Sequence, residues 1–255
     1  MIPPGFRADF MVVGAQKGGT TALASFLRNH PEICLSSDKE PHFFDLDFFF
    51  EGDEPRYAWY LMYYAHHDGQ KVGGEATPTY MYRPDVAGRL RDYNPRLKLI
   101  ALLRHPAERA YSQYNMMRAR GAEPLSFREA LRAEETRLLE AGADRVPGSP
   151  YWIHSYKQRG RYASQIRNLL KYFPRDQLLV LRSEDLLHQH YRVLAEVFRF
   201  LDVGTNHRPP PARVFAGEYC TPMSRSDREL LLEYYAQETE ELEQMLGWDL
   251  AAWKR

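Results

Sequence analysis

Short apolar runs alternate along the chain with segments whose apolar residues recur at helical spacing. The apolar runs predict buried strands at residues 10–13, 33–35, 97–103 and 177–181. Apolar residues three or four positions apart predict helices with one buried face, and these segments begin near residues 20, 160, 191 and 224. Further helices are expected from near residues 59 and 106, and a solvated helix with a charged outer face over residues 126–141. Strands that alternate with helices predict an α/β fold, a single domain over residues 1–255 with a central parallel sheet flanked by helices. Ligands of such sheets bind at the carboxyl edge of the strands.

A glycine-rich segment connects the first predicted strand to the first predicted helix. Residues 14–21 read Gly-Ala-Gln-Lys-Gly-Gly-Thr-Thr. The glycines permit a tight turn with outward N–H groups, and the helix N-terminus adds a partial positive charge. Lys17 supplies a full positive charge, and Thr20 and Thr21 supply hydroxyl donors. A turn without a ligand does not need these three side chains, so the segment predicts a phosphate-binding loop.

The loop differs from that of the nucleotide triphosphatases. Their motif places Lys-Ser/Thr directly after the second of two glycines five positions apart, with the hydroxyl on Mg²⁺. Gly14 and Gly19 have this spacing, but Thr20 follows Gly19 and the lysine is Lys17. A lysine inside the loop can reach a 5′-phosphate and its leaving oxygen without a metal. A small-molecule kinase that uses Mg-ATP is the first alternative, and a nucleotide-binding module without catalysis is the second.

The charge balance and the lack of long apolar runs narrow the class of protein. The chain has 255 residues, of which 34 are Lys or Arg and 34 are Asp or Glu, so the formal net charge is zero. This balance argues against a general nucleic-acid or membrane-surface binder. The apolar runs are too short to span a bilayer, and no leader-like segment precedes the first strand. We expect a cytoplasmic protein; the catalytic domain of a lumenal protein is the alternative.

Glu40 is the candidate general base. It precedes Pro41 and is followed by His42 and two phenylalanines. Aromatic neighbours disfavour a charged carboxylate, so we expect a raised pKa that suits proton transfer. An acid on a surface loop is the alternative. His42 is the second candidate for the base, although a structural hydrogen bond is the favoured role for it.

Arg104 and Ser112 form a second candidate anion site. Arg104 directly follows the apolar run 97–103, and Ser112 lies on the helix that begins at Pro106. An arginine at the carboxyl edge of a strand, with a serine on the next helix, can grip a dianionic phosphate. An ordinary salt bridge of Arg104 is the alternative.

These three segments together resemble the sulfotransferases that use 3′-phosphoadenosine 5′-phosphosulfate (PAPS). The resemblance is closest to the N- and 3-O-sulfotransferases of heparan sulfate and their bacterial relatives, and it extends with gaps from about residue 10 to about residue 248. It implies that the loop binds the 5′-phosphosulfate through Gln16, Lys17, Gly18, Gly19, Thr20 and Thr21. It also implies that Arg104 and Ser112 hold the 3′-phosphate.

The resemblance further implies transfer of a sulfuryl group from PAPS to a hydroxyl or amine of a carbohydrate, lipid or small-molecule acceptor, with no metal required. Glu40 would take the proton of the acceptor, and Lys17 would stabilise the bridging oxygen. Ala76 departs from the pattern, because the heparan enzymes carry an active-site lysine there; this weakens any claim for heparan-like substrates. Tyr162 matches a family tyrosine near the nucleotide, and the segment 206–222, with Arg208 and Arg213, corresponds to a loop that closes over PAPS.

Aromatic residues concentrate between residues 46 and 70. Packing in the core is the default explanation for them. Exposed members near a transferase cleft could also stack on a sugar or another flat acceptor. The sequence indicates neither the identity of the acceptor nor the oligomeric state.

Overall fold

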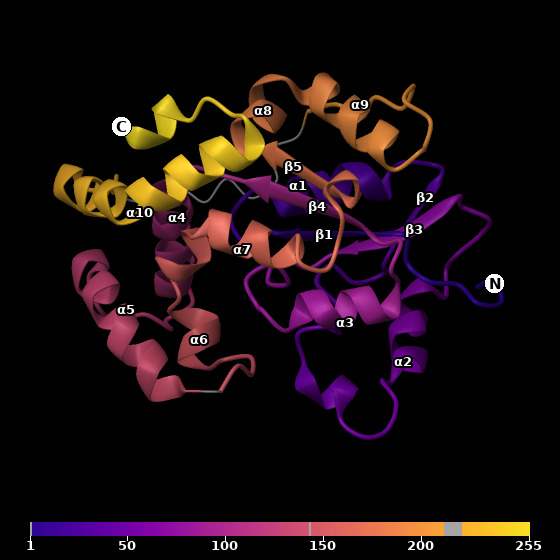
Figure 1. Cartoon of the computed structure of the whole chain (residues 1–255), viewed down its shortest axis with the longest axis horizontal. Helices are drawn as coiled ribbons and strands as arrows, with labels where there is room; N and C mark the ends of the chain where they lie inside the picture. Colours follow the sequence, from indigo (N-terminus) through magenta and orange to yellow (C-terminus); the bar gives the residue numbers. More distant parts are fainter. Residues whose placement is uncertain (1, 143, 212–220) are drawn as a thin grey trace. The chain divides into compact units, whose positions relative to one another are not determined.

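A computed structural model describes residues 2–142, 144–211 and 221–255. The chain divides into two compact units (Figure 1). The first consists of Met1–Arg104 and Ile166–Phe215, and the second of His105–Gln165 and Ala216–Arg255. The sheet lies in the first unit, whereas the described part of the second unit is helical.

The first unit contains a five-stranded sheet with the order β2-β3-β1-β4-β5, in which all neighbouring strands are parallel. The strands are β1 (Phe10–Gly14), β2 (Ile33–Leu35), β3 (Val72–Ala76), β4 (Lys98–Leu103) and β5 (Leu178–Arg182). The connection after β1 leads towards β2 at one edge, and the connection after β4 leads towards β5 at the other edge. The strand order therefore changes direction between β1 and β4, which is where open parallel sheets bind their ligands.

The expected parallel sheet is confirmed, and four of its five strands coincide with the apolar runs. The sequence does not predict β3, because Gly73 and Gly74 interrupt its apolar pattern. A Cβ atom at Gly73 would lie 2.4 Å from the ring of Phe6, and one at Gly74 would lie 2.4 Å from the ring of Phe10. These glycines therefore make room for aromatic rings that pack across the sheet.

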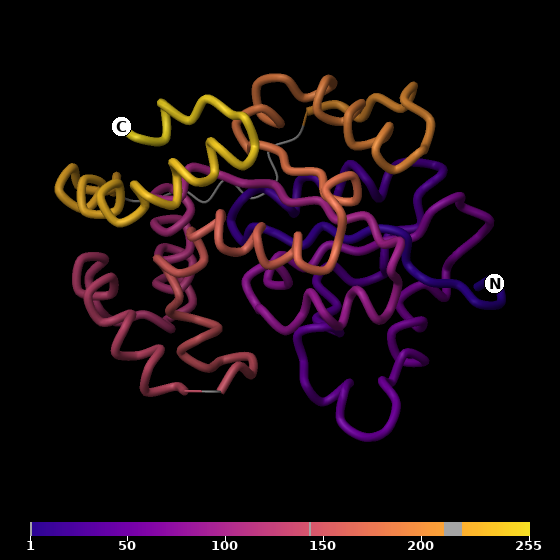
Figure 2. Tube along the Cα trace, in the orientation of Figure 1, coloured from indigo at the N-terminus to yellow at the C-terminus, as the bar shows by residue number. Residues whose placement is uncertain are grey.

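Helices lie on both sides of this sheet. In the view of Figure 1, α8 (Ser183–His188) and α9 (His190–Phe200) lie above the strands, and α2 (Tyr57–Leu61) and α3 (Val86–Tyr93) lie below them. The main apolar core joins α9 and α1 (Thr20–Arg28) to the strands. Figure 2 shows the orange α9 segment beside the indigo N-terminal part of the trace, although the two are far apart in the sequence. Short 3₁₀ helices span Asp47–Phe50, Met62–Tyr64 and Arg175–Gln177.

The second unit is built from α4 (Pro106–Ala119), α5 (Phe127–Ala141), α6 (Pro150–Ile153) and α10 (Arg225–Leu246), with 3₁₀ helices at Gln158–Gly160 and Ala251–Lys254. Helix α7 (Tyr162–Leu169) begins in this unit and ends in the first. Ser126 caps α5 in a capping box with Glu129, and Ser224 caps α10 as expected. Tyr235 is the buried tyrosine of α10, whereas Tyr234 is 37% exposed.

Two buried charged side chains organise the second unit. The carboxylate of Glu134 accepts the backbone N–H groups of Lys157, at 2.6 Å, and Gln158, at 2.8 Å. Burial raises the pKa of Glu134 to about 7, against the lowering effect of these hydrogen bonds. Arg109, which is fully buried, donates to Gln113 and to the carbonyl of Tyr156. These bonds tie the loop before α7 to α4 and α5.

Within the described ranges, no helix combines the length and the apolar content that crossing a membrane requires.

Candidate active site

The glycine-rich loop leaves β1 and packs tightly against the end of β4. The backbone N–H of Ala15 donates to the carbonyl of Leu102 at 2.9 Å, and that of Gly18 donates to the carbonyl of Ala15 at 2.8 Å. A Cβ atom at Gly18 would lie 2.2 Å from the Leu102 carbonyl oxygen, so this position requires glycine. Lys17 and Gly19 both have left-handed backbone, with φ of 68° and 95°. This turn sets the direction in which α1 begins.

The start of α1 is suited to an anion. Gly19 is its N-cap and provides no side-chain hydrogen bond to the first turn. The leading amides of a helix need such a partner, and a phosphate can supply it. The buried side-chain oxygen of Gln16 also has no hydrogen-bond partner among the described residues. The loop thus leaves hydrogen-bonding groups available at the start of α1, and the binding of a phosphosulfate by residues 16–21 stays a prediction.

Arg104 lies near this loop. It is the first residue after β4 and comes two positions after Leu102, whose carbonyl oxygen binds the loop. Two extended residues span about 7 Å, which is shorter than a nucleotide. Ser112 is buried in α4 and belongs to the second unit. The backbone of Arg104 therefore lies close to the loop, and the binding of a phosphate by Arg104 and Ser112 stays a prediction.

Glu40 lies at the same edge of the sheet. Its backbone N–H donates to the carbonyl of Ala76 at 3.2 Å, and Ala76 pairs with Val12 of β1, two residues before the loop begins. The Glu40 backbone is left-handed, with a φ of 63°. Such backbone costs energy in residues other than glycine and is common at functional sites. The segment 36–45 thus brings a carboxylate to the carboxyl edge of the sheet, near the point where the strand order changes direction.

Two cations contact the Glu40 carboxylate. Lys39 forms an ion pair with one of its oxygens, and the Nε2 atom of His42 lies 3.5 Å from the other. Burial alone would raise the pKa of Glu40. The hydrogen bond with His42 and the charge of Lys39 outweigh burial and lower the pKa to about 2. The expected raised pKa is therefore wrong. The Phe43 and Phe44 side chains are fully buried and pack on Tyr60, so they do not form the apolar surroundings of Glu40 that the sequence suggested.

A buried carboxylate holds His42 in place. The Nδ1 atom of His42 lies 2.9 Å from Oδ2 of Asp45, whose side chain is fully buried and accepts a further hydrogen bond from Thr79. Burial alone would lower the pKa of His42, but the hydrogen bonds and charges of Asp45 and Glu40 raise it to about 9. An imidazolium that points one nitrogen at each carboxylate therefore orients Glu40. His42 is charged and donates, which does not suit it to act as the base.

A second carboxylate lies beneath this site. Glu75 of β3 is fully buried and accepts hydrogen bonds from Thr77 at 2.6 Å, Tyr60 at 3.0 Å and Tyr80 at 3.1 Å. Burial raises its pKa to about 7 against these hydrogen bonds. The next residue, Ala76, is 1% exposed and brings no charge to the position where the resemblance expects a lysine.

The aromatic segment divides between core and surface. Tyr60 and Tyr64 are fully buried and their ring centroids lie 5.4 Å apart, as the default explanation predicted. Phe48 and Trp59 are 53% and 59% exposed. The Arg56 guanidinium lies over the Phe48 ring, 4.0 Å from its centroid.

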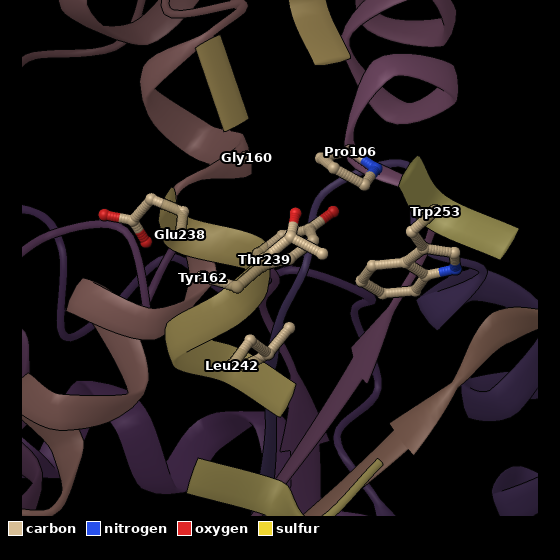
Figure 3. A pocket seen from close by; sticks show the side chains of 7 residues that line it. All are labelled: Pro106, Gly160, Tyr162, Glu238, Thr239, Leu242 and Trp253. Carbon is tan, nitrogen blue, oxygen red and sulfur yellow. The ribbon is translucent and has the colours of Figure 1, made fainter. Parts of the chain in front are cut away.

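Tyr162 is part of the interior of the second unit. Its side chain is 2% exposed, and it lines a small pocket with Pro106, Gly160, Leu242 and Trp253 (Figure 3). Its ring centroid lies 6.1 Å from that of Trp253. These contacts account for Tyr162 by packing, and a role near the nucleotide stays a prediction. Of the segment 206–222, residues 212–220 with Arg213 lie outside the described residues.

Three residues near this site, Lys39, Asp45 and Ser183, are not part of the motifs described above. Lys39 and Asp45 flank the Glu40–His42 pair, and the spacing of three between His42 and Asp45 was the available signal. Ser183 follows β5, and its hydroxyl oxygen would lie 3.4 Å from a Cβ atom at Gly19. No local pattern connects Ser183 to the loop. Across residues 2–142, 144–211 and 221–255, no group of His, Cys, Asp and Glu side chains is arranged to hold a metal ion.

A parallel sheet with a glycine-rich loop and a hydrogen-bonded carboxylate at its carboxyl edge is typical of α/β proteins that bind a ligand at this edge. The family model described as sulfotransferase domain matches residues 7–213. The chain belongs to this sulfotransferase family.

Solved and curated relatives agree with this family. The crystal structure of a sulfotransferase from Alicyclobacillus acidocaldarius superposes with a TM-score of 0.82 at 31% identity, over 98% of this chain and 100% of that one. The bifunctional heparan sulfate N-deacetylase/N-sulfotransferase 3 of Mus musculus is 29% identical over 96% of this chain and 31% of its own length. The heparan sulfate glucosamine 3-O-sulfotransferase 6 of Mus musculus is 32% identical over 75% of this chain and 51% of its own length. The chain thus spans about a third to a half of these two curated relatives.

Proposed function

We propose that the protein transfers the sulfuryl group of PAPS to a hydroxyl or amine of its acceptor, and that residues 1–255 act as one sulfotransferase domain. The observation that carries this proposal is the common position of the loop, Arg104 and Glu40 at the carboxyl edge of β1, β3 and β4. One adenosine ligand with an anion at each end fits a site with the loop at one end and Arg104 at the other.

Each residue has a stated role in this proposal. PAPS supplies an activated sulfuryl group. Lys17 and the amides of residues 18–21 neutralise the 5′ end, and Lys17 stabilises the charge that develops on the leaving oxygen. Arg104, with Ser112, binds the 3′-phosphate. Glu40 accepts the proton of the acceptor, and the His42–Asp45 pair keeps its carboxylate oriented and ionised.

The acceptor class is a further part of the proposal. Both heparan sulfate relatives are named for carbohydrate substrates, and the exposed rings of Phe48 and Trp59 can stack on sugar faces. We propose a carbohydrate acceptor; a lipid or small-molecule acceptor would be sulfated by the same residues. Ala76 distinguishes the site from one built for heparan sulfate itself. We propose a cytoplasmic location. A lumenal location is the alternative, because one relative at 28% identity is a membrane-associated sulfotransferase of Dictyostelium discoideum.

Binding of the product nucleotide tests the donor. Isothermal titration calorimetry should show that adenosine 3′,5′-bisphosphate binds without Mg²⁺ and that Mg-ATP does not compete with it. Tight binding of Mg-ATP without binding of the bisphosphate would support a kinase instead. A screen of acceptors with radiolabelled donor then identifies the substrate, and bisphosphate binding without transfer to any acceptor would indicate a binding module.

Two substitutions test the roles of the residues. Lys17→Ala and Glu40→Gln should each lower turnover about 100-fold or more, the usual cost of losing a charge stabiliser or a general base. Lys17→Ala should also weaken bisphosphate binding, whereas Glu40→Gln should leave it unchanged. Normal turnover in Glu40→Gln would exclude Glu40 as the base.

A further inference from the structure

The ion pair between Lys39 and Glu40 poses a problem for proton transfer. A carboxylate held between Lys39 and the His42 imidazolium has a pKa of about 2. A general base works best when its pKa lies near the working pH, so this carboxylate is too weak a base in the free protein. One of the two cations has to move before Glu40 can accept a proton efficiently.

The surroundings of the two cations differ. His42 is held by the fully buried Asp45 at 2.9 Å, and Asp45 is itself bound by Thr79. For Lys39, the partner that the structure records is Glu40, and the two side chains are 25% and 32% exposed. Partly exposed ion pairs of flexible side chains contribute little to stability. Lys39 is therefore the cation that can leave at low cost.

Lys39 also lies close enough to the donor loop to find a second partner. The Glu40 N–H binds the carbonyl of Ala76, and Ala76 pairs with Val12 of β1, two residues before Gly14. One strand spacing is about 4.8 Å, and two strand residues span about 7 Å. Ala76, whose carbonyl accepts the Glu40 N–H, is small and uncharged, so it adds no further cation beside Glu40.

We propose that Lys39 responds to the donor: it neutralises Glu40 in the free protein and turns to the sulfuryl oxygens when the donor is bound. This inference rests on the proposed function. In the transfer step, the acceptor oxygen or nitrogen forms a bond to sulfur and the bond from sulfur to the bridging oxygen breaks. The proton of the acceptor goes to Glu40, and adenosine 3′,5′-bisphosphate leaves with the electron pair. Donor binding thus releases the base and supplies a cation to the transferring group.

The test uses the Glu40→Gln background, in which the donor is not consumed and Lys39 has no carboxylate to neutralise. PAPS and adenosine 3′,5′-bisphosphate differ by the sulfuryl group, so calorimetry with both separates contacts to that group from contacts to the nucleotide. Adding Lys39→Met should weaken PAPS binding at least about tenfold, the value of a charge-assisted hydrogen bond. Bisphosphate binding should stay within about twofold. Lys39→Arg should keep most of the affinity for PAPS.

Lys98→Met is the matched control, because the Lys98 side chain is 29% exposed, close to the 25% of Lys39, and forms an ion pair with Asp202 at the start of β4, away from the carboxyl edge of the sheet. It should leave both affinities unchanged. If Lys39→Met changes neither affinity, Lys39 serves Glu40 alone and the proposal is overturned; an equal loss for both nucleotides overturns it as well. Failure of the unsubstituted protein to bind the bisphosphate would instead refute the proposed function.

Discussion

Gly18→Ala tests the position of the glycine-rich loop on the end of β4. A Cβ atom at this position would lie 2.2 Å from the Leu102 carbonyl oxygen and 2.8 Å from that of Ala15, whereas ordinary contact begins at 3.4 Å. Both obstacles are backbone atoms and cannot rotate away. The loop would have to move by about 1 Å, and a misplacement of that size commonly costs about 100-fold in activity.

We therefore expect Gly18→Ala to weaken the binding of adenosine 3′,5′-bisphosphate about 100-fold, because the displaced amides no longer converge on the phosphate. The unfolding free energy should fall by about 1–3 kcal/mol, the usual cost of overpacking. Calorimetry measures the first quantity and urea denaturation the second.

Gly88→Ala is the matched control for this experiment. Its Cβ atom would lie 3.5 Å from the Tyr172 ring, in ordinary contact, and Gly88 lies inside α3, where alanine is favoured. This variant should bind the nucleotide normally. Normal binding and normal stability in Gly18→Ala would refute the close approach of the loop to Leu102, and with it the geometry of the donor site.

Two further substitutions test the buried charges of each unit. Asp45→Asn should lower the pKa of His42 from about 9 towards its ordinary 6.5, so an NMR titration of the imidazole should shift downwards. Because the folded pKa of His42 is raised, the His42–Asp45 pair contributes its full stability below pH 6.5 and loses it as the pH rises through 9. The loss of unfolding free energy in Asp45→Asn, measured by urea denaturation, should therefore be larger at pH 6 than at pH 9.5. An equal loss at both pH values would contradict the ion pair. Glu134→Ala should destabilise the protein by about 1–3 kcal/mol, because the N–H groups of Lys157 and Gln158 lose their acceptor. Glu135→Ala, a change at the adjacent exposed carboxylate, is the control, and an equal effect of both would refute this role of Glu134.

The sequence predicted most of the sheet because apolar runs of this kind need burial on both faces. It missed β3, whose glycines carry no hydrophobic signal and are explained by the rings of Phe6 and Phe10 from other segments.

The candidate site likewise has one part that the sequence predicted and one part that it did not. The loop at residues 14–21 was predictable because its chemistry lies in consecutive residues: strand, glycines, lysine, threonines and helix start. The environment of Glu40 was not predictable from the sequence. The pKa of Glu40 depends on Lys39, His42 and Asp45, which lie in a loop whose backbone adopts left-handed conformations. The flanking phenylalanines suggested a raised pKa, but their rings pack into the core.

The sequence by itself thus determined the class of fold and the glycine-rich turn between β1 and α1, because both are marked by patterns among residues close in the chain; anion binding by this turn stays a prediction. The tertiary structure decided which strands are neighbours, and so that Glu40, Arg104 and the loop share one edge of the sheet. It also decided the charge state of Glu40, because electrostatic interactions depend on distances in space, and these are set only when β3 enters the sheet between β1 and β2.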